Sequence, residues 1–169
     1  ETLNSVTNIN AGLMRFSDFG GPVLYPVRPI DDAVSPEIIT SIAQATDDAY
    51  EIASTVNSSS NTLKLSESTN AVTLGLRYQD LNIPSGAVIT NAYIRFSSSA
   101  FNSGATNLTF SAEKVGNAIT FSDTSNNISA RTKTINSVLW DTGNDWPVSG
   151  ETVVSPDLSS VVQEIVDQA

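Results

Sequence analysis

The sequence predicts an all-β fold, an antiparallel β-sandwich with one short C-terminal helix and an extended N-terminal arm. Three observations predict this class. Hydrophobic residues make up 40% of the 169 residues and charged residues 15%, and much of the remainder is Ser, Thr and Asn, which suit strands and turns better than helices. Several segments alternate apolar and polar residues, and turn residues separate those segments. A chain of this length forms one core, with or without an arm.

Residues 1–35 predict the arm, because Gly20-Gly21-Pro22, Pro26 and Pro29 interrupt any regular element. The segment is nevertheless rich in apolar side chains, which are poorly tolerated in water as a free tail. We therefore expect the arm to dock on its own domain, residues 36–169, or on a neighbouring molecule. The residues expected to make this contact are Leu13, Phe16, Phe19, Leu24 and Tyr25.

The segment 35–54 fits two structures. Ser35 and Pro36 make a good helix start, and Ile38, Ile39 and Ile42 could form a helical stripe. A strand through Ile42, Asp48 and Ile52 fits almost as well, and we favour the strand.

Two alternating strands follow, joined across a tight turn at Pro84-Ser85-Gly86. The first is residues 72–78 and the second is residues 88–96. In both, the period of 2 predicts that one face packs on a core and the polar alternate face meets solvent. The apolar faces are Val72, Leu74, Leu76 and Tyr78, and Val88, Thr90, Ala92, Ile94 and Phe96.

Further short strands are predicted at residues 107–112 and 134–140, the second leading to Trp140, which we expect in the core. The helix is predicted at residues 155–169. Ser155 is its expected cap, Pro156 its first residue and Asp157 a favourable charge in its first turn. Its apolar stripe is Leu158, Val161, Val162, Ile165 and Val166.

The segments "DDAYE" at 47–51, "GLRY" at 75–78, "IPSGAVITNAYIRF" at 83–96, "SAEKVGNAITF" at 111–121, "ISARTKT" at 128–134, "SVLW" at 137–140 and "SPDLSSVVQEIVDQA" at 155–169 occur in this order. As a set, over residues 38–169, they resemble the DNRLRE-type, or disaggregatase-related, β-sandwich modules of secreted bacterial and archaeal surface proteins. The resemblance implies a jelly-roll-like sandwich, usually non-catalytic, with carbohydrate binding in some members. It also favours a strand at residues 47–51.

In that family the chain continues past the helix into further strands, whereas this sequence stops at Ala169. Either those strands are absent from this sequence or something else fills their places in the sheet. The arm of residues 1–35 could fill them, within the molecule or in the next subunit, because an open sheet edge accepts another strand.

Composition excludes several function classes. The formal charge of -10 opposes binding to nucleic acid, which needs a basic surface. The sequence has no His and no Cys, which excludes Ser-His-Asp and Cys-His catalysis. No two carboxylates stand out as a glycosidase pair, so we expect no enzymatic activity.

No apolar run is long enough to span a membrane, and the chain begins with Glu1. We therefore expect a secreted or cell-surface protein.

Two acidic segments are candidates for Ca²⁺, which binds carboxylate and carbonyl oxygens. In the first, Asp47 and Glu51 share one face if the segment is a strand. The second is the loop 141–151, with Asp141 and Asp145, which does not follow the EF-hand pattern. Each segment also has an explanation that involves no ion. The first can be a solvated acidic edge, and the second can be an Asx turn.

Aromatic side chains are the candidates for a sugar site, because a ring face packs against the apolar side of a sugar. Trp146, in the acidic loop, is the first of them, and Tyr50 and Tyr78 are weaker candidates. The sequence thus leads to a non-catalytic extracellular module that binds a polysaccharide or other glycan, with Ca²⁺ as the expected ion. The alternative is a self-assembling subunit of a filament, sheath or matrix, in which the arm completes a neighbour's sheet.

Overall fold

The structure is a computed structural model that describes residues 36–103, 106–143, 145–146 and 149–168, and the backbone of Asn10–Ala11 and Arg28–Pro29. For residues 102–103 and 145–146 the description is of the backbone. The chain divides into two units, Glu1–Ile39 and Thr40–Ala169. In the first unit, β1 (Asn10–Ala11) pairs antiparallel with β2 (Arg28–Pro29). The five arm residues expected to make contacts, Leu13, Phe16, Phe19, Leu24 and Tyr25, lie outside the described residues.

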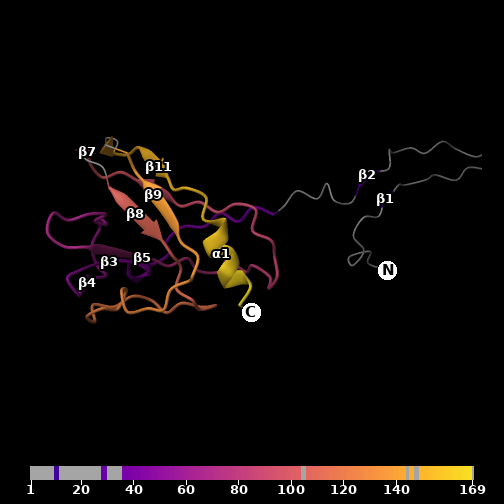
Figure 1. The fold of residues 1–169 in the computed structure, drawn as a ribbon, viewed down its shortest axis with the longest axis horizontal. Coiled ribbons are helices and arrows are strands. Elements are labelled where there is room, and N and C mark those ends of the chain that lie inside the picture. The colour runs from indigo at the N-terminus through magenta and orange to yellow at the C-terminus, as the bar shows by residue number, and fades with distance from the viewer. Residues whose placement is uncertain are drawn as a thin grey trace, which may run out of the picture. The chain divides into compact units, whose positions relative to one another are not determined.

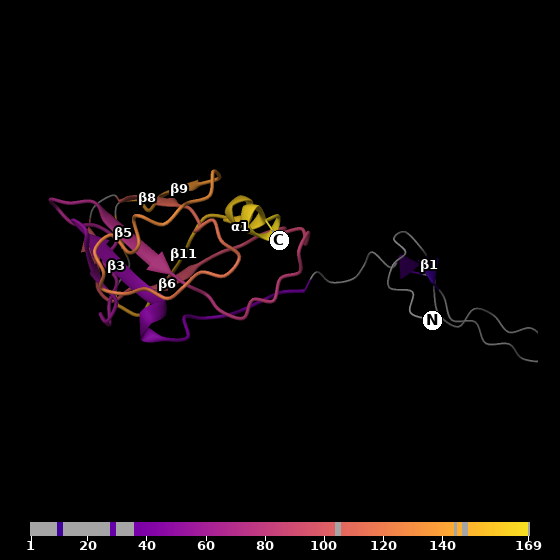
Figure 2. The same cartoon turned by 90° about the horizontal axis from the view of Figure 1, so that it is seen from below.

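The second unit is mainly β, as the sequence predicts, and its described strands form small antiparallel sheets (Figure 1). One sheet has the order β4-β3-β5, and three others pair β6 with β11, β7 with β10 and β8 with β9. One short helix, α1, lies beside the strands at one end of this unit (Figures 1 and 2). The elements are β3 (Asp48–Ile52), β4 (Thr55–Asn57), β5 (Val72–Leu76), β6 (Arg95–Ser97), β7 (Asn102–Ser103), β8 (Asn107–Phe110), β9 (Val138–Asp141), β10 (Asp145–Trp146), β11 (Thr152–Val154) and α1 (Ser159–Val166).

The segment 35–54, which fits a helix or a strand by sequence, contains a strand from Asp48 onward, as we favoured. A 3-10 turn at Ala45–Asp47 precedes this strand. Its alternation places Asp47, Ala49 and Glu51 on one buried face. The buried cluster on this side consists of Ala49, Val56, Phe121 and Ile128. Two of its four members, Phe121 and Ile128, come from the long segment between β8 and β9, which therefore covers this face of the sheet.

The prediction that the polar face of residues 72–78 meets solvent is wrong. Gly75 is buried, and a Cβ at this position would lie 2.4 Å from Cζ of Phe121. Arg77, on the same face, donates to the fully buried Asp47 carboxylate at 2.7 Å. This face is covered because Gly75 leaves room for an aromatic ring and Arg77 brings its own counter-charge.

The turn at Pro84–Gly86 is confirmed, since the Ala87 N–H donates to the Pro84 carbonyl at 3.1 Å and Gly86 has φ of 73°. The two strands that flank this turn do not pair with each other. β5 pairs with β3, and β6 pairs with β11.

The strand predicted at residues 88–96 is regular only from Arg95. Before it, side chains of the C-terminal segment take the place of a partner strand. The Ile94 N–H donates to the Ser155 hydroxyl, and the Ala92 N–H donates to the Asp157 carboxylate. Ala92, Ile94 and Phe96 point inward as predicted, but Val88 is 82% exposed.

Helix α1 begins later than the sequence predicts, at Ser159 in place of the residues just after Ser155. The reason is that Ser155 and Leu158 donate their backbone N–H groups to the carbonyls of Ile94 and Ala92, so this stretch extends the β6–β11 pairing. Leu158, Val161 and Val166 are buried as expected. Gln163 holds α1 to residues 87–89 by accepting from Ile89 N–H and donating to the Ala87 carbonyl.

A second apolar cluster is aromatic. The Trp140 ring lies 5.8 Å from the rings of Phe96 and Phe110, centroid to centroid. Trp140 is 9% exposed, so its predicted place in the core is confirmed. These rings join β6 to the β8–β9 pair.

Candidate functional site: a groove beside β5 and β6

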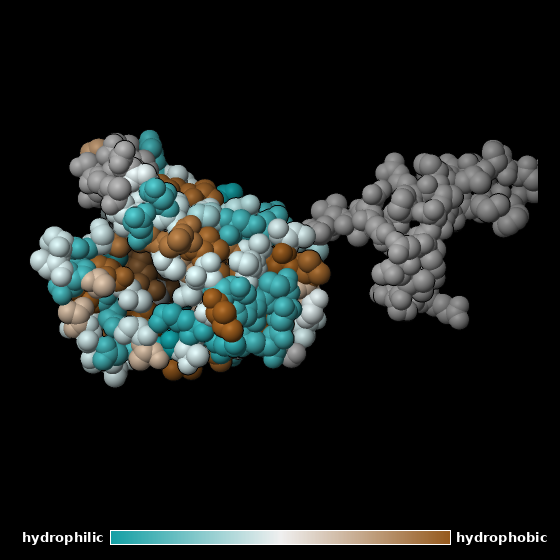
Figure 3. Space-filling view, in the orientation of Figure 1, coloured by the Kyte–Doolittle hydropathy of each residue, from teal (hydrophilic) through white to brown (hydrophobic). Residues whose placement is uncertain are grey.

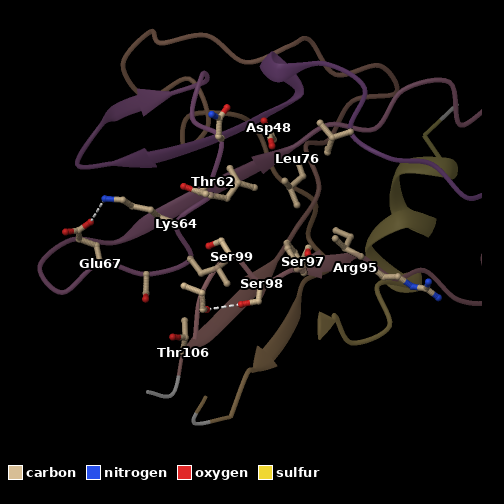
Figure 4. A pocket seen from close by; sticks show the side chains of 18 of the residues that line it. Asp48, Thr62, Lys64, Glu67, Leu76, Arg95, Ser97, Ser98, Ser99 and Thr106 are labelled. Atoms are coloured by element: carbon tan, nitrogen blue, oxygen red, sulfur yellow. Dashed lines mark hydrogen bonds and ion pairs between the residues drawn. The ribbon is translucent and has the colours of Figure 1, made fainter. Parts of the chain in front are cut away.

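The described surface carries a groove of about 750 Å³. The end of β5, strand β6 with the residues around it, and the loop 61–68 line it. Figure 4 shows Leu76 on one side of the groove, Ser97 and Ser98 on another, and Thr62, Lys64 and Glu67 on the loop. In the space-filling view, hydrophobic residues gather within a hollow of the visible face (Figure 3). The groove therefore combines aliphatic walls with hydroxyl and charged groups.

The edge of β5, whose last residue Leu76 lines the groove, is open. The Arg77 N–H donates to the Asp47 carbonyl at 2.7 Å, which makes residues 47 and 77 a hydrogen-bonded pair of the antiparallel β3–β5 ladder. Such pairs alternate along the ladder, so Thr73 and Gly75 also bond to β3. Val72, Leu74 and Leu76 consequently direct their backbone groups away from β3. Within the described residues, no backbone partner meets them there.

β6 presents a second such edge. Ser155 donates to the Ile94 carbonyl and Ser98 donates to the Glu151 carbonyl, both at 2.9 Å, so the even-numbered residues face the β11 side. Arg95 and Ser97 direct their backbone groups the other way, where the described part of the chain supplies no strand. Both residues line the groove.

The charges in the groove are mixed. Lys64 and Glu67 form an ion pair at 3.5 Å on the loop, and Asp48 and Arg95 lie elsewhere in the lining. Burial raises the pKa of Asp48, and the neighbouring Asp47 carboxylate adds to the rise. Burial likewise raises the pKa of Tyr78.

Asp47, a candidate metal ligand, is completely buried and bound by protein groups. Its carboxylate accepts hydrogen bonds from Arg77 and Gln79, and Thr120 lies at 3.5 Å. Burial by itself would raise the pKa of Asp47, but these hydrogen bonds and the Arg77 charge lower it overall. The ion pair between Asp47 and Arg77 fixes the end of β5 against the turn that precedes β3.

Glu51, the second candidate on this face, is 4% exposed. One carboxylate oxygen accepts from the N–H groups of Ile128 and Ser129, each at 3.0 Å, and the other accepts from the Ser129 hydroxyl. Burial opposes ionisation, yet these hydrogen bonds and the charge of Lys133 lower the pKa of Glu51 overall. Glu51 thereby ties the loop 122–131 to β3.

The remaining predicted residues lie apart. Asp141 ends β9 and accepts from the Gly143 N–H at 3.0 Å, which is an Asx turn. Asp145 and Trp146 form β10, whose backbone pairs with β7, and their side chains are outside the description. In the part of the chain that the structure describes, no three acidic side chains form a metal-binding group. Calcium binding stays a prediction.

Of the three aromatic candidates, Tyr78 lines the groove. Tyr50 is half-buried on β3 with Lys64 Nζ 5.9 Å from its ring centre. The groove itself was not predicted, because its lining depends on how β5, β6 and a loop without regular structure meet. The only signal in the sequence was the alternation in "TLKL" at 62–65, which puts Leu63 and Leu65 on one side.

Comparisons with family models, with curated proteins and with solved structures found no match for this chain. Among the described residues, no helix has the length and apolar character needed to cross a membrane.

Proposed function

We propose that this chain is a non-catalytic module of an extracellular or cell-surface assembly that joins polypeptides by β-strand addition. Its class is the DNRLRE-type, jelly-roll-like sandwich that the sequence motifs resemble. The observation that carries the proposal is the open edge of β5 beside the groove. An unpaired edge is a template for another strand, and strand addition supplies affinity through the main chain and specificity through alternate side chains.

The edge can be tested by one substitution that blocks it without breaking the sheet. Leu74 directs its N–H away from β3, so proline at this position removes a donor from the open edge only, where proline is tolerated. We expect Leu74→Pro to abolish self-association in light scattering and negative-stain microscopy. Leu74→Ala is the matched control, because it shortens the same side chain and keeps the N–H.

Both variants should keep the circular dichroism spectrum of the parent chain. Equal association of Leu74→Pro and Leu74→Ala would contradict a role for this edge. A parent chain that stays monomeric at all concentrations, and captures no strand-forming peptide, would contradict the proposed function itself.

Carbohydrate binding is the second candidate. The observation that favours it is the position of Tyr78 in a groove that also contains Asn61, Thr62 and several serines, since sugar sites combine an aromatic face with hydrogen-bonding groups. On an affinity gel or glycan array, Tyr78→Ala and Trp146→Ala should each reduce retention. Tyr93→Ala, at an exposed position outside the groove lining, should not. No retention of the parent chain would remove this candidate.

Calcium stabilisation is tested by calorimetric melting with CaCl₂ or EDTA, because an ion that binds only the folded state raises its stability by mass action. The expected result is a higher melting temperature with Ca²⁺ and a smaller rise in Asp141→Asn. Identical melting curves with and without EDTA would contradict it.

A further inference from the structure

Three segments of the chain have the pattern Asn-x-Ser/Thr, beginning at Asn57, Asn107 and Asn127. This pattern, the sequon, is the acceptor for N-linked glycosylation, and it has to lie on the surface of a secreted protein. A chain rich in Asn, Ser and Thr contains sequons by chance, so sequence alone does not rank the three. The structure distinguishes them by the surroundings of the Asn amide and of the hydroxyl two residues later.

The sequon at Asn127 is engaged at both ends. The Asn127 amide oxygen accepts from the Ser122 N–H at 3.0 Å and from Arg131 Nη2 at 3.2 Å. The Ser129 hydroxyl donates to the buried Glu51 carboxylate. Transfer of a sugar at this position would break contacts that hold the loop to β3.

The sequon at Asn57 is also engaged. Asn57 is half-buried, and its amide oxygen accepts from the Ser59 N–H at 3.1 Å. Ser58, which lies between them, is buried, and its N–H and hydroxyl both donate to Asp123 at 2.9 Å. A transferase that draws this segment into its own site would break the link between the end of β4 and Asp123.

The sequon at Asn107, the first residue of β8, differs in both respects. Asn107 and Thr109 are exposed, and they point to the same side because alternate residues of a strand share a face. Within the described part of the chain, no hydrogen bond or ion pair engages either side chain. Leu108, between them, lies opposite the buried Trp140. The amide and the hydroxyl of this sequon are therefore available together.

We propose that Asn107 carries an N-linked glycan. The co-reactant is an oligosaccharide carried on a polyprenyl pyrophosphate. Asn107 Nδ2 forms a bond to C1 of the first sugar and gives up one proton, while the bond from C1 to the pyrophosphate oxygen breaks and the carrier leaves with its electron pair. The proposal rests on the extracellular location in the proposed function, and it is independent of strand addition.

The glycan leaves the groove beside β5 and β6 open. Thr106, the residue before Asn107, lines that groove. The Thr142 N–H donates to the Thr106 carbonyl at 3.1 Å, which continues the β8–β9 pairing by one residue. Adjacent residues of an extended chain point to opposite faces, so the Asn107 side chain points away from the groove.

The glycan instead covers the outer face of the β8–β9 pair. Leu139 of β9 lies opposite Thr109 and is 75% exposed. Asp141 lies opposite Asn107, so Leu139 is the diagonal neighbour of Asn107, at a separation of about 7–8 Å. A sugar attached to Asn107 can therefore remove this leucine from water, which is favourable for apolar surface.

Tryptic mapping tests the site, because the three sequons fall in separate peptides, residues 16–64, 96–114 and 115–131. The bond from Arg28 to Pro29 resists trypsin, so the first peptide stays whole. The full-length chain is isolated from the cells that naturally produce it, treated with peptide N-glycosidase in ¹⁸O-labelled water, and digested. The enzyme converts a glycosylated Asn to labelled Asp. We expect the label in peptide 96–114 alone.

Variants made in the same cells identify the acceptor. Asn107→Gln and Thr109→Ala should each lose the glycan, the second because it removes the hydroxyl and keeps the amide. Asn57→Gln and Asn127→Gln are the matched controls and should keep it. An unlabelled peptide 96–114, or a label in either of the other two peptides, would overturn the assignment. Neither result would affect strand addition, which the Leu74→Pro comparison decides.

The covering of Leu139 has a separate readout. Asn107→Gln should increase the fluorescence of a hydrophobic dye bound to the folded chain, and adding Leu139→Thr to that variant should remove the increase. Equal dye fluorescence of the parent chain and Asn107→Gln would show that the glycan does not cover this leucine.

Discussion

Single buried carboxylates stabilise the fold of this protein by accepting hydrogen bonds. Glu51 is the clearest case, since three donors from Ile128 and Ser129 converge on it in a site that is 4% exposed. Glu51→Ala would leave two backbone N–H groups without an acceptor. We expect a loss of about 1–3 kcal/mol in the free energy of unfolding, because the Ile128 N–H is buried and an unsatisfied buried donor costs about that much, whereas Ser129 is exposed and water can bind its N–H.

Chemical denaturation measures this loss. Glu37→Ala is the control, because Glu37 is exposed and its removal should change the free energy of unfolding by no more than about 0.5 kcal/mol. A Glu51→Ala protein as stable as the control would mean that water replaces the carboxylate without cost.

The same carboxylates predict how stability depends on pH. The folded-state pKa values of Asp47 and Glu51 are lowered below unfolded values of about 4. Their contribution is therefore present above about pH 4 and is lost as the pH falls through the folded-state values. The raised pKa of Asp48 acts in the opposite sense and offsets part of this loss.

Denaturation midpoints measured from pH 7 to pH 3 should fall, and Asp47→Asn/Glu51→Gln should flatten the decline. Some slope should remain, because backbone hydrogen bonds also lower the pKa of Asp157 and Glu164. An unchanged slope in the double variant would show that the two buried carboxylates do not control acid stability.

At the scale of elements, the contact between β5 and the loop 111–135 depends on the absence of a side chain. Phe121 lies against Gly75, where a Cβ would be 2.4 Å from its ring. We expect Gly75→Ala to cost about 1–3 kcal/mol through overpacking, measured by thermal unfolding. Gly116→Ala is the matched control, since a Cβ there meets nothing within 4 Å. Equal melting temperatures for the two variants would mean that the ring moves aside freely.

Local pattern predicted some of these elements and missed others, for identifiable reasons. The alternation of Val72, Leu74 and Leu76 was sufficient to predict β5, and Pro84 with Gly86 was sufficient to predict the turn. Alternation does not reveal the partner of a strand, so β5 and β6 were expected to be joined neighbours. Nor could it show that Arg77 would be paired with a buried Asp47, since that contact spans 30 residues. The start of α1 was misplaced because Ser155 bonds to a strand rather than to the helix.

At the scale of the whole molecule, composition predicted the mainly β class, but the groove depends on long-range geometry that no local pattern contains. The open edge of β5 becomes recognisable only once its pairing with β3 defines which residues point outward. The acidic segment 47–51 illustrates the same limit. Its charges suggested an ion, whereas the structure supplies Arg77, Gln79, Ser129 and backbone N–H groups to its two buried carboxylates.

The net charge gives the last prediction. Each copy carries a formal charge of -10, so copies that assemble must approach against mutual repulsion. The Debye length falls from about 30 Å at 0.01 M salt to about 8 Å at 0.15 M, while backbone hydrogen bonds between strands are little affected. Self-association should therefore strengthen on adding NaCl, as measured by light scattering at fixed protein concentration. Glycan retention through neutral hydroxyl contacts should change little over the same range. Association that weakens with salt would instead mean that opposite charges, rather than strand addition, hold the copies together.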